Sequence, residues 1–339
     1  MLQLLKLLGM DKWLWQETGT IDHGKRVDLP GTQPIRALTH VTIHFFQNTH
    51  NAFFDEIVEL VKSGKLDRQL DLQYGEVPIE ITPGKYRTPG IVNSTQTIKI
   101  HETFLSYQWC ITYTIYTLYL ETIDYPKVNA AAGYIAKKIS PDKVDKAKEV
   151  FNYARYLIKH FDHWDKDELP NPERYPAAER DYIEQSNISF TEGMKFILCH
   201  ELAHAKKHLD ELPDDSCISC FQEMEYDADN EAIDSILLGA GQERKFIAEV
   251  GIVLGILSMI FFRSTTTGTK HPNVEDRVTN ALQRMEVVED SIAWAFACVG
   301  LELWDEQFDL KFDWKAKGTI TFRDLYFNII EQIKSNRAS

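Results

Sequence analysis

The chain has 339 residues, a length that accommodates one large domain or two moderate ones. Hydrophobic residues make up 44% of it and charged residues 26%, which is typical of a globular protein rather than a disordered or fibrous one. The formal net charge of -14 excludes a protein that wraps nucleic acid, because neutralising phosphates needs clustered Lys and Arg. The five cysteines are scattered and odd in number, which favours a reducing, cytoplasmic environment over a secreted disulfide framework.

The first part of the chain mixes helical and extended patterns. Residues 1–15 carry several leucines but one early Lys and no small-residue cleavage site, so they predict an amphipathic helix rather than a signal peptide. Apolar residues recur at helical spacing over residues 51–64. Apolar and polar residues alternate over 76–83 and 94–104, which predicts strands. This is an α+β pattern.

Two apolar stretches raise the question of a membrane span, which needs about 20 apolar residues. Residues 250–262 are apolar throughout but only 13 long, between Glu249 and Arg263, and so predict a buried helix. Residues 103–120 carry no charge, but Ser, Gln, Thr and four Tyr are interleaved among the apolar residues, as in a packed aromatic segment. We therefore expect no membrane span.

The second part of the chain is helical. Ser140 and Pro141 have the residue types of an N-cap and a first helical position, and a charged, proline-rich connection follows at 161–176. Further helices are predicted at 176–187, 190–209, 222–239, 246–262, 272–287 and 288–304.

The sequence thus predicts a predominantly helical α+β fold in two parts. We expect a mixed N-terminal part at 1–140, with a role in substrate selection, and a helical domain at 141–339. The proline-rich stretch at 164–176 competes with residue 140 as the boundary.

Two histidines lie four residues apart on one predicted helix. Ser189 followed by Glu192 has the pattern of a capping box and predicts the start of this helix. At 3.6 residues per turn, His200 and His204 lie one above the other, close enough for both imidazoles to bind one cation. With Glu201 between them they form HExxH, in which zinc takes two His nitrogens and the Glu is the general base. The alternative is a core helix whose two histidines are hydrogen-bonded.

The third ligand has to come from the carboxylates of the next helix. On a helical wheel, Glu225 and Asp229 fall within the apolar stripe of residues 228–237, whereas Glu223 and Asp227 fall roughly opposite. A charge within an apolar stripe is costly unless a metal or an imidazole compensates it. We therefore predict Glu225 as the ligand and Asp229 as the acceptor for the other N–H of a ligand histidine. Glu223 and Asp227, on the opposite side of the helix, are predicted to form a solvent-exposed, charged face.

These motifs resemble a known class of peptidases. HELAH followed by EYDAD resembles the gluzincin zinc metallopeptidases of the HtpX and CAAX-protease type, which also carry a His-Pro with an Arg five residues after the Pro. Here His271, Pro272 and Arg277 have that spacing. The resemblance covers about residues 195–282 and implies a zincin-like metallopeptidase core. Those relatives are usually membrane-embedded; a soluble chain with a long N-terminal part is similar to the Lit-type phage-exclusion peptidases, which cleave a host translation factor.

The resemblance implies roles for the residues around the ion. Zn²⁺ held by two histidines and a Glu activates water, and Glu201 passes the water's proton to the leaving amine. His271 or Arg277 donates to the oxyanion if the loop at 264–272 folds over the site. The alternative is that Pro272 begins a helix and Arg277 lies on its exposed side.

Two further patterns give weaker indications. His208 is a third histidine at helical spacing, but the metzincin pattern needs its third His at position 210, which is Asp210. Cys217 and Cys220 form a CxxC without a second CxxC or paired His, so they predict a plain loop rather than a structural zinc site.

The leading hypothesis from the sequence is a soluble zinc endopeptidase that acts on a protein or peptide substrate. A catalytically silent zinc-binding regulatory or sensor protein is the alternative, and a helical interaction protein with an accidental motif is a third. The sequence does not indicate an oligomeric state.

Overall fold

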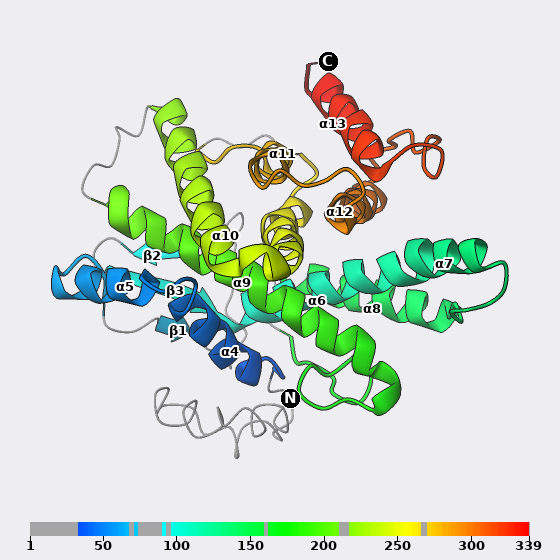
Figure 1. Cartoon of the computed structure of the whole chain (residues 1–339), viewed down its shortest axis with the longest axis horizontal. Coiled ribbons are helices and arrows are strands. Elements are labelled where there is room, and N and C mark those ends of the chain that lie inside the picture. Colours follow the sequence, from blue (N-terminus) through cyan, green and yellow to red (C-terminus); the bar gives the residue numbers. More distant parts are fainter. Residues whose placement is uncertain are drawn as a thin grey trace.

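Long helices dominate the described part of the chain, and one small sheet lies beside them (Figure 1). The predicted helix at 1–15 and the predicted strand at 76–83 lie outside the described residues. The computed structural model describes residues 33–67, 71–73, 90–92, 96–158, 162–209, 217–265 and 270–338.

The sheet follows two short helices, α4 (Arg36–Gln47) and α5 (Phe53–Lys62), of which α5 confirms the helix predicted at 51–64. Its strands are in the order β1-β3-β2, with β3 parallel to β1 and antiparallel to β2. The predicted strand at 94–104 is correct at its centre but ends at residue 101, because the side chain there caps the next helix by accepting the backbone N–H of residue 103 at 3.1 Å. The strands are β1 (Asp71–Gln73), β2 (Gly90–Val92) and β3 (Thr97–His101).

Helix α6 (Glu102–Tyr119) is buried along nearly its whole length, between α8 (Pro141–Leu157), α9 (Arg180–Lys207) and α12 (Ile292–Phe308). Two of its large polar side chains are bonded inside the protein: Gln108 donates to the Leu254 carbonyl at 3.2 Å, and Trp109 donates to the Asn187 side chain at 2.7 Å. A buried polar group needs such a partner. The prediction of a packed aromatic segment at 103–120 is therefore confirmed.

Helix α8 (Pro141–Leu157) begins where the sequence predicts. Ser140 is its N-cap residue, but the Ser140 side chain makes no capping bond; its backbone N–H donates to Glu121 at 2.6 Å instead. A π-helical turn and α7 (Tyr125–Ala132) connect α6 to α8. Helices α6 and α8 lie on either side of residue 140 in the sequence and pack against each other. The division of the chain at residue 140 stays a prediction.

Helix α9 (Arg180–Lys207) is one continuous helix of 28 residues. The two segments predicted at 176–187 and 190–209 are therefore wrong as separate helices. Ser189 and Glu192 lie in the middle of α9, so the predicted capping box is also wrong. Both side chains are buried among neighbouring helices, and the Glu192 carboxylate forms ion pairs within the fold instead of a cap.

Helix α10 (Ile218–Leu257) consists of two arms that meet at Gly241. There the backbone has φ 60° and ψ -178°, a conformation open almost only to glycine. The two helices predicted at 222–239 and 246–262 correspond to these arms. Figure 1 shows the bend between the two arms of α10.

The second arm of α10 crosses α9 at a point where both backbones come close together. A Cβ atom on Gly251 would lie 2.4 Å from the Cβ of Glu192, and one on Gly193 would lie 3.0 Å from the Gly251 carbonyl oxygen. Glycine at the crossing therefore sets the spacing between the two longest helices of the described chain.

One helical stretch, Ile218–Phe262, is long and apolar enough to cross a membrane by length and composition. However, 72% of its most apolar window is buried inside the fold, as in the core helix of a soluble protein. The segment at 250–262 is therefore a buried helix, as predicted.

Three helices complete the described chain, and the sequence predicts the first two of them at 272–287 and 288–304. The third helix was not predicted. It packs on α12, and its Tyr326 hydroxyl donates to the Glu275 carbonyl at 3.2 Å. These helices are α11 (Val274–Arg284), α12 (Ile292–Phe308) and α13 (Phe322–Ala338).

Candidate metal centre

Two histidines and a glutamate converge where α9 runs beside the first arm of α10. The Nε2 atoms of His200 and His204 are 3.1 Å apart. One oxygen of Glu225 lies 3.5 Å from His200 Nε2, and the other lies 3.5 Å from His204 Nε2. These donor atoms all lie within 4.8 Å of one another. Around a tetrahedral zinc with bonds of about 2.0–2.1 Å, neighbouring donor atoms are roughly 3.3 Å apart.

Glu225 is buried, as its place in the apolar stripe predicts. Burial raises the pKa of a carboxyl group, but hydrogen bonds with His204 and His271 and the charges of His200 and Arg277 outweigh this effect. The pKa of Glu225 is therefore held well below its usual range, and the side chain is an anion. An anionic oxygen is the form that binds a cation.

Asp229 lies behind His200, on the side away from His204. One Asp229 oxygen is 2.9 Å from His200 Nδ1, in a contact that is close but not aligned as a hydrogen bond. The same carboxylate accepts two hydrogen bonds from the Arg277 guanidinium, at 2.6 and 2.7 Å. Burial raises the pKa of Asp229, but the Arg277 charge and these hydrogen bonds outweigh burial and lower the pKa.

Arg277 is buried on α11. The alternative, in which Arg277 lies on the exposed side of a helix that begins at Pro272, is therefore wrong. One guanidinium nitrogen lies 3.8 Å from Glu225. Burial lowers the pKa of Arg277, but the charges of Asp229, Glu225 and Glu201 outweigh it and raise the pKa. Arg277 therefore balances the buried carboxylates around the two histidines.

Glu201, the predicted general base, is also buried beside the cluster. Its carboxylate lies close enough to Arg277 for its charge to raise the pKa of that group. The structure thus brings the HExxH glutamate into the same charged interior as Asp229 and Glu225.

His271 reaches the cluster from the loop before α11. Its Nδ1 lies 3.0 Å from Glu225, and its side chain is 70% exposed. Next to it, the Lys270 ammonium lies 4.3 Å from the centre of the Phe221 ring on α10. The end of this loop therefore lies on the solvent side of the site; residues 266–269 of the predicted covering loop lie outside the described residues.

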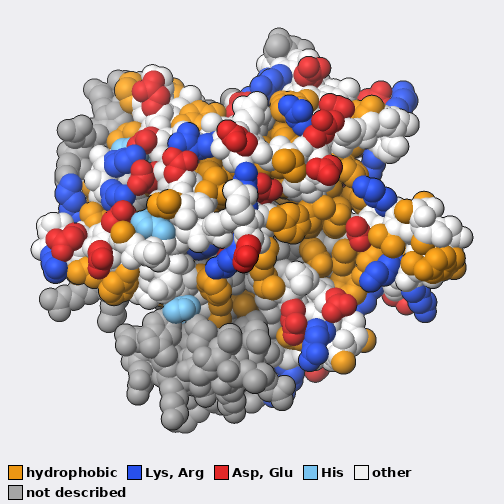
Figure 2. Space-filling model, in the orientation of Figure 1, with side chains coloured by type: hydrophobic (Ala, Val, Ile, Leu, Met, Phe, Trp, Pro, Cys, Tyr) orange, Lys and Arg blue, Asp and Glu red, His pale blue; other side chains and the backbone are white. Residues whose placement is uncertain are grey.

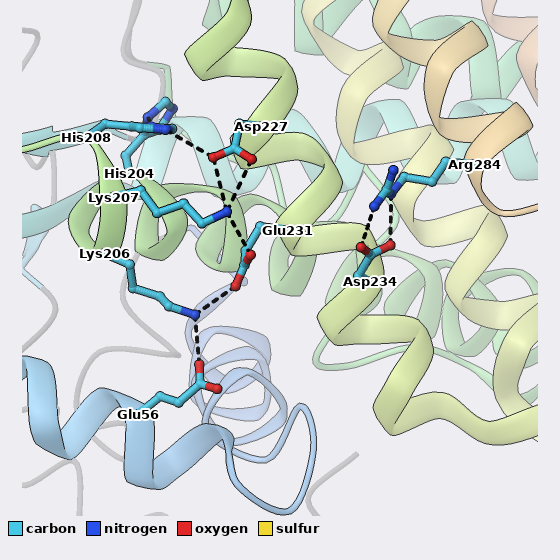
Figure 3. A network of polar contacts seen from close by, with 9 residues as sticks. All are labelled: Glu56, His204, Lys206, Lys207, His208, Asp227, Glu231, Asp234 and Arg284. Carbon is cyan, nitrogen blue, oxygen red and sulfur yellow. Dashed lines mark hydrogen bonds and ion pairs between the residues drawn. The ribbon is translucent and has the colours of Figure 1, made fainter.

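His204 has a second neighbour that the sequence analysis did not assign. His204 Nδ1 lies 2.9 Å from Nδ1 of His208, and His208 Nε2 lies 3.2 Å from Asp227 (Figure 3). Burial and the charge of His204 lower the pKa of His208, although Asp227 acts to raise it. The helical wheel correctly puts Asp227 on a solvated face, where Lys207 also pairs with it.

The two cysteines of the CxxC are bonded to each other at the start of α10. The prediction of a plain loop is therefore wrong at this position: Cys217 is the N-cap residue and Cys220 lies in the first turn. Three residues apart in a helical turn, the two side chains lie close enough for a bond. The remaining cysteines are free and buried: Cys110, Cys199 and Cys298.

Comparison with known proteins adds one match. A family model described as Peptidase U49 matches residues 98–297, which is 200 of the 339 residues. The matched stretch includes every residue of the cluster and ends before α13. No curated protein and no solved structure matches the chain.

Proposed function

The chain belongs to the Peptidase U49 family, and from this we propose that it is a zinc-dependent endopeptidase of gluzincin type that hydrolyses a protein substrate. The observation that carries the proposal is the convergence of His200, His204 and Glu225, with donor atoms within 4.8 Å of one another. Membership of the family makes the protein a peptidase; the metal, the gluzincin class and the substrate are the proposed part.

The residues present fit a zinc ion. Two imidazoles and one carboxylate are a donor set that catalytic zinc sites use, with a further coordination position left for other ligands. His200 and His204 present nitrogens to each other at 3.1 Å, and a shared cation explains why two such acceptors converge. Zinc held there supplies a Lewis acid that polarises the scissile carbonyl and lowers the pKa of the attacking water.

Glu201 is the proposed general base. It takes the proton of the attacking water and delivers it to the nitrogen of the leaving amine. Its buried position near Arg277 keeps the carboxylate in a charged interior that excludes bulk water. The base therefore acts where electrostatic interactions are stronger than in solvent.

His271 and Arg277 are proposed to act differently. His271 is exposed on the solvent side of Glu225, where a substrate carbonyl can reach it, and we assign it to donate to the oxyanion. The Arg277 guanidinium binds Asp229 through two N–H groups and is buried, so we assign it to hold Asp229 and Glu225 in place. In this arrangement the buried charge of Arg277 lies behind the histidines, and the substrate approaches from the solvent side of Glu225.

The compartment and the substrate-selecting part are proposals from the sequence. We propose a cytoplasmic location, because Cys110, Cys199 and Cys298 are buried, free thiols and the one disulfide joins neighbouring cysteines, unlike the disulfide framework of a secreted domain. We assign substrate selection to residues 1–140, which include all of the sheet.

Glu201→Gln tests the mechanism, because it removes the base and leaves the three zinc ligands. We expect the purified variant to keep about one zinc per chain and to lose cleavage by roughly 10²–10⁴-fold, the contribution of general acid–base catalysis. A search for new protein termini in cells that express wild type beside Glu201→Gln should find termini that only wild type generates.

The outcomes separate the rival functions. Zinc in both proteins with identical terminus profiles would favour a zinc-binding regulatory protein and reject the peptidase mechanism. Wild-type protein that binds no zinc would reject both.

A further inference from the structure

The two histidines of the proposed zinc site have different partners for their second ring nitrogen. Behind His200 lies the buried carboxylate of Asp229. Behind His204 lies another imidazole, that of His208, the C-cap residue of α9, with 2.9 Å between the two Nδ1 atoms. Figure 3 shows the pair at the end of α9, with the Asp227 carboxylate facing His208 from α10.

Zinc binding gives the hydrogen bonds of this pair one direction. An imidazole that presents the lone pair of Nε2 to a metal carries its proton on Nδ1. The Nδ1–H of His204 then donates, and Nδ1 of His208 accepts. A neutral His208 carries its own proton on Nε2, which donates to Asp227 at 3.2 Å.

We propose that His208 and Asp227 form a positioning pair for His204, which holds its ring in the tautomer and orientation that zinc binding requires. The inference rests on the proposed zinc site. Metal-ligating histidines commonly donate their other N–H to a carboxylate or carbonyl, and such partners strengthen metal binding. Here an imidazole stands between the ligand and the carboxylate.

The pair is itself held from two helices. Both Asp227 oxygens accept from the Lys207 ammonium, at 3.1 and 3.2 Å, and the same ammonium lies 3.0 Å from Glu231. His208 is 12% exposed while Asp227 is 47% exposed, so the contact between them joins a mostly buried ring to a carboxylate at the surface.

The network continues beyond the site. Lys206 binds Glu231 on α10 at 2.7 Å and Glu56 on α5 at 3.0 Å. Figure 3 shows this chain of contacts from α5 to α10. Asp227 therefore has a defined position relative to α9 rather than that of an isolated surface carboxylate.

The test measures zinc affinity, by competition with a chromophoric chelator on metal-free, full-length protein. His208→Phe keeps a ring but removes the acceptor, and we expect it to weaken zinc binding about 10–100-fold. His208→Gln keeps an acceptor oxygen and should recover part of the loss. Asp227→Asn keeps the shape of the side chain and removes its charge, and should weaken binding less than His208→Phe.

Asp234→Asn is the matched control, because Asp234 is also an exposed α10 carboxylate paired with a basic side chain, Arg284, away from the histidines. We expect its zinc affinity to equal that of wild type. The visible spectrum of the Co²⁺-substituted protein should change in His208→Phe and not in Asp234→Asn, because the spectrum reports the ligand geometry.

Two results would overturn the inference: a zinc affinity of His208→Phe equal to wild type, or equal losses in Asp227→Asn and Asp234→Asn. If His208→Phe fails to fold, as judged by circular dichroism of the metal-free protein, the comparison of the two aspartate variants decides the matter. Zinc-free wild type would reject the proposed site itself, whereas zinc-loaded wild type with unchanged variants would reject only the positioning pair.

Discussion

The two histidines of HExxH lie one turn apart on the same helix, yet their surroundings differ. Behind His200, Asp229 and Arg277 form a fully buried pair joined by two hydrogen bonds. Behind His204, the contacts run through His208 to Asp227, which is half-exposed and paired with Lys207. One helix face therefore carries a buried side and a solvent-facing side.

The two sides differ in how much folding free energy is lost when an ion pair is broken. A buried ion pair is expensive to break, because removing one partner leaves a charge that neither water nor protein compensates. An exposed pair is screened, and water replaces the lost partner. We therefore expect the His200 side to control folding as well as metal binding, and the His204 side to control metal binding with little effect on folding.

The largest effect should come from Asp229→Ala. It leaves the Arg277 guanidinium buried without its main partner, and we expect a loss of about 3–5 kcal/mol in the free energy of unfolding. Urea denaturation of the metal-free protein measures it. Arg284→Ala, which removes a similar two-bond pair with Asp234 at the surface, is the control and should cost at most about 1 kcal/mol. Equal losses in the two variants would contradict the division into a buried and an exposed side.

Gly251→Ala should disturb both sides together. Its new Cβ would lie 2.4 Å from the Glu192 Cβ, so α9 and α10 have to move apart where they cross. We expect a loss of about 1–3 kcal/mol in the free energy of unfolding, as for overpacking, with weaker zinc binding. Gly133→Ala is a control for the loss of a glycine, because a Cβ there meets nothing within 4 Å, although its positive φ adds a local cost. Unchanged zinc affinity in Gly251→Ala would show that the crossing does not set the site.

Lys207→Ala should have the smallest effect on folding and so sharpen the comparison. It removes the cation that holds Asp227 on the exposed side, and we expect at most about 1 kcal/mol in the free energy of unfolding. Zinc affinity should still fall, because Asp227 loses a partner that positions it toward His208. Isothermal titration with zinc, beside thermal unfolding of the metal-free protein, separates the two effects. A large loss of stability with unchanged affinity would reverse the expected order.

Part of the candidate site follows from spacing along single helices. The i, i+4 separation puts His200 and His204 on one face of α9, and helical phase puts Glu225 in the apolar stripe of α10. The break between the two arms of α10 also follows from the sequence, because the apolar pattern is interrupted by a glycine-containing stretch that includes Gly241.

Other features depend on contacts between elements that are distant in the sequence. The capping pattern at Ser189 and Glu192 is a local signal, and it is overridden because neighbouring helices bury that part of α9. The position of Arg277 in the sequence is compatible with either a buried or an exposed face of α11. Only its hydrogen bond to Asp229, which is 48 residues away in the sequence, shows that Arg277 is buried.

The sequence by itself determined which residues share a helix face, because a fixed rise and turn place residues four apart together: the HExxH pair, and Glu225 with Asp229. Only the tertiary structure decided which partner each face meets. The packing of α9 beside the first arm of α10 joins Glu225 to the histidines, Asp229 to His200 and Asp227 to His208. Those pairings depend on the distance and angle between two helices, which are set by packing and not by any local pattern.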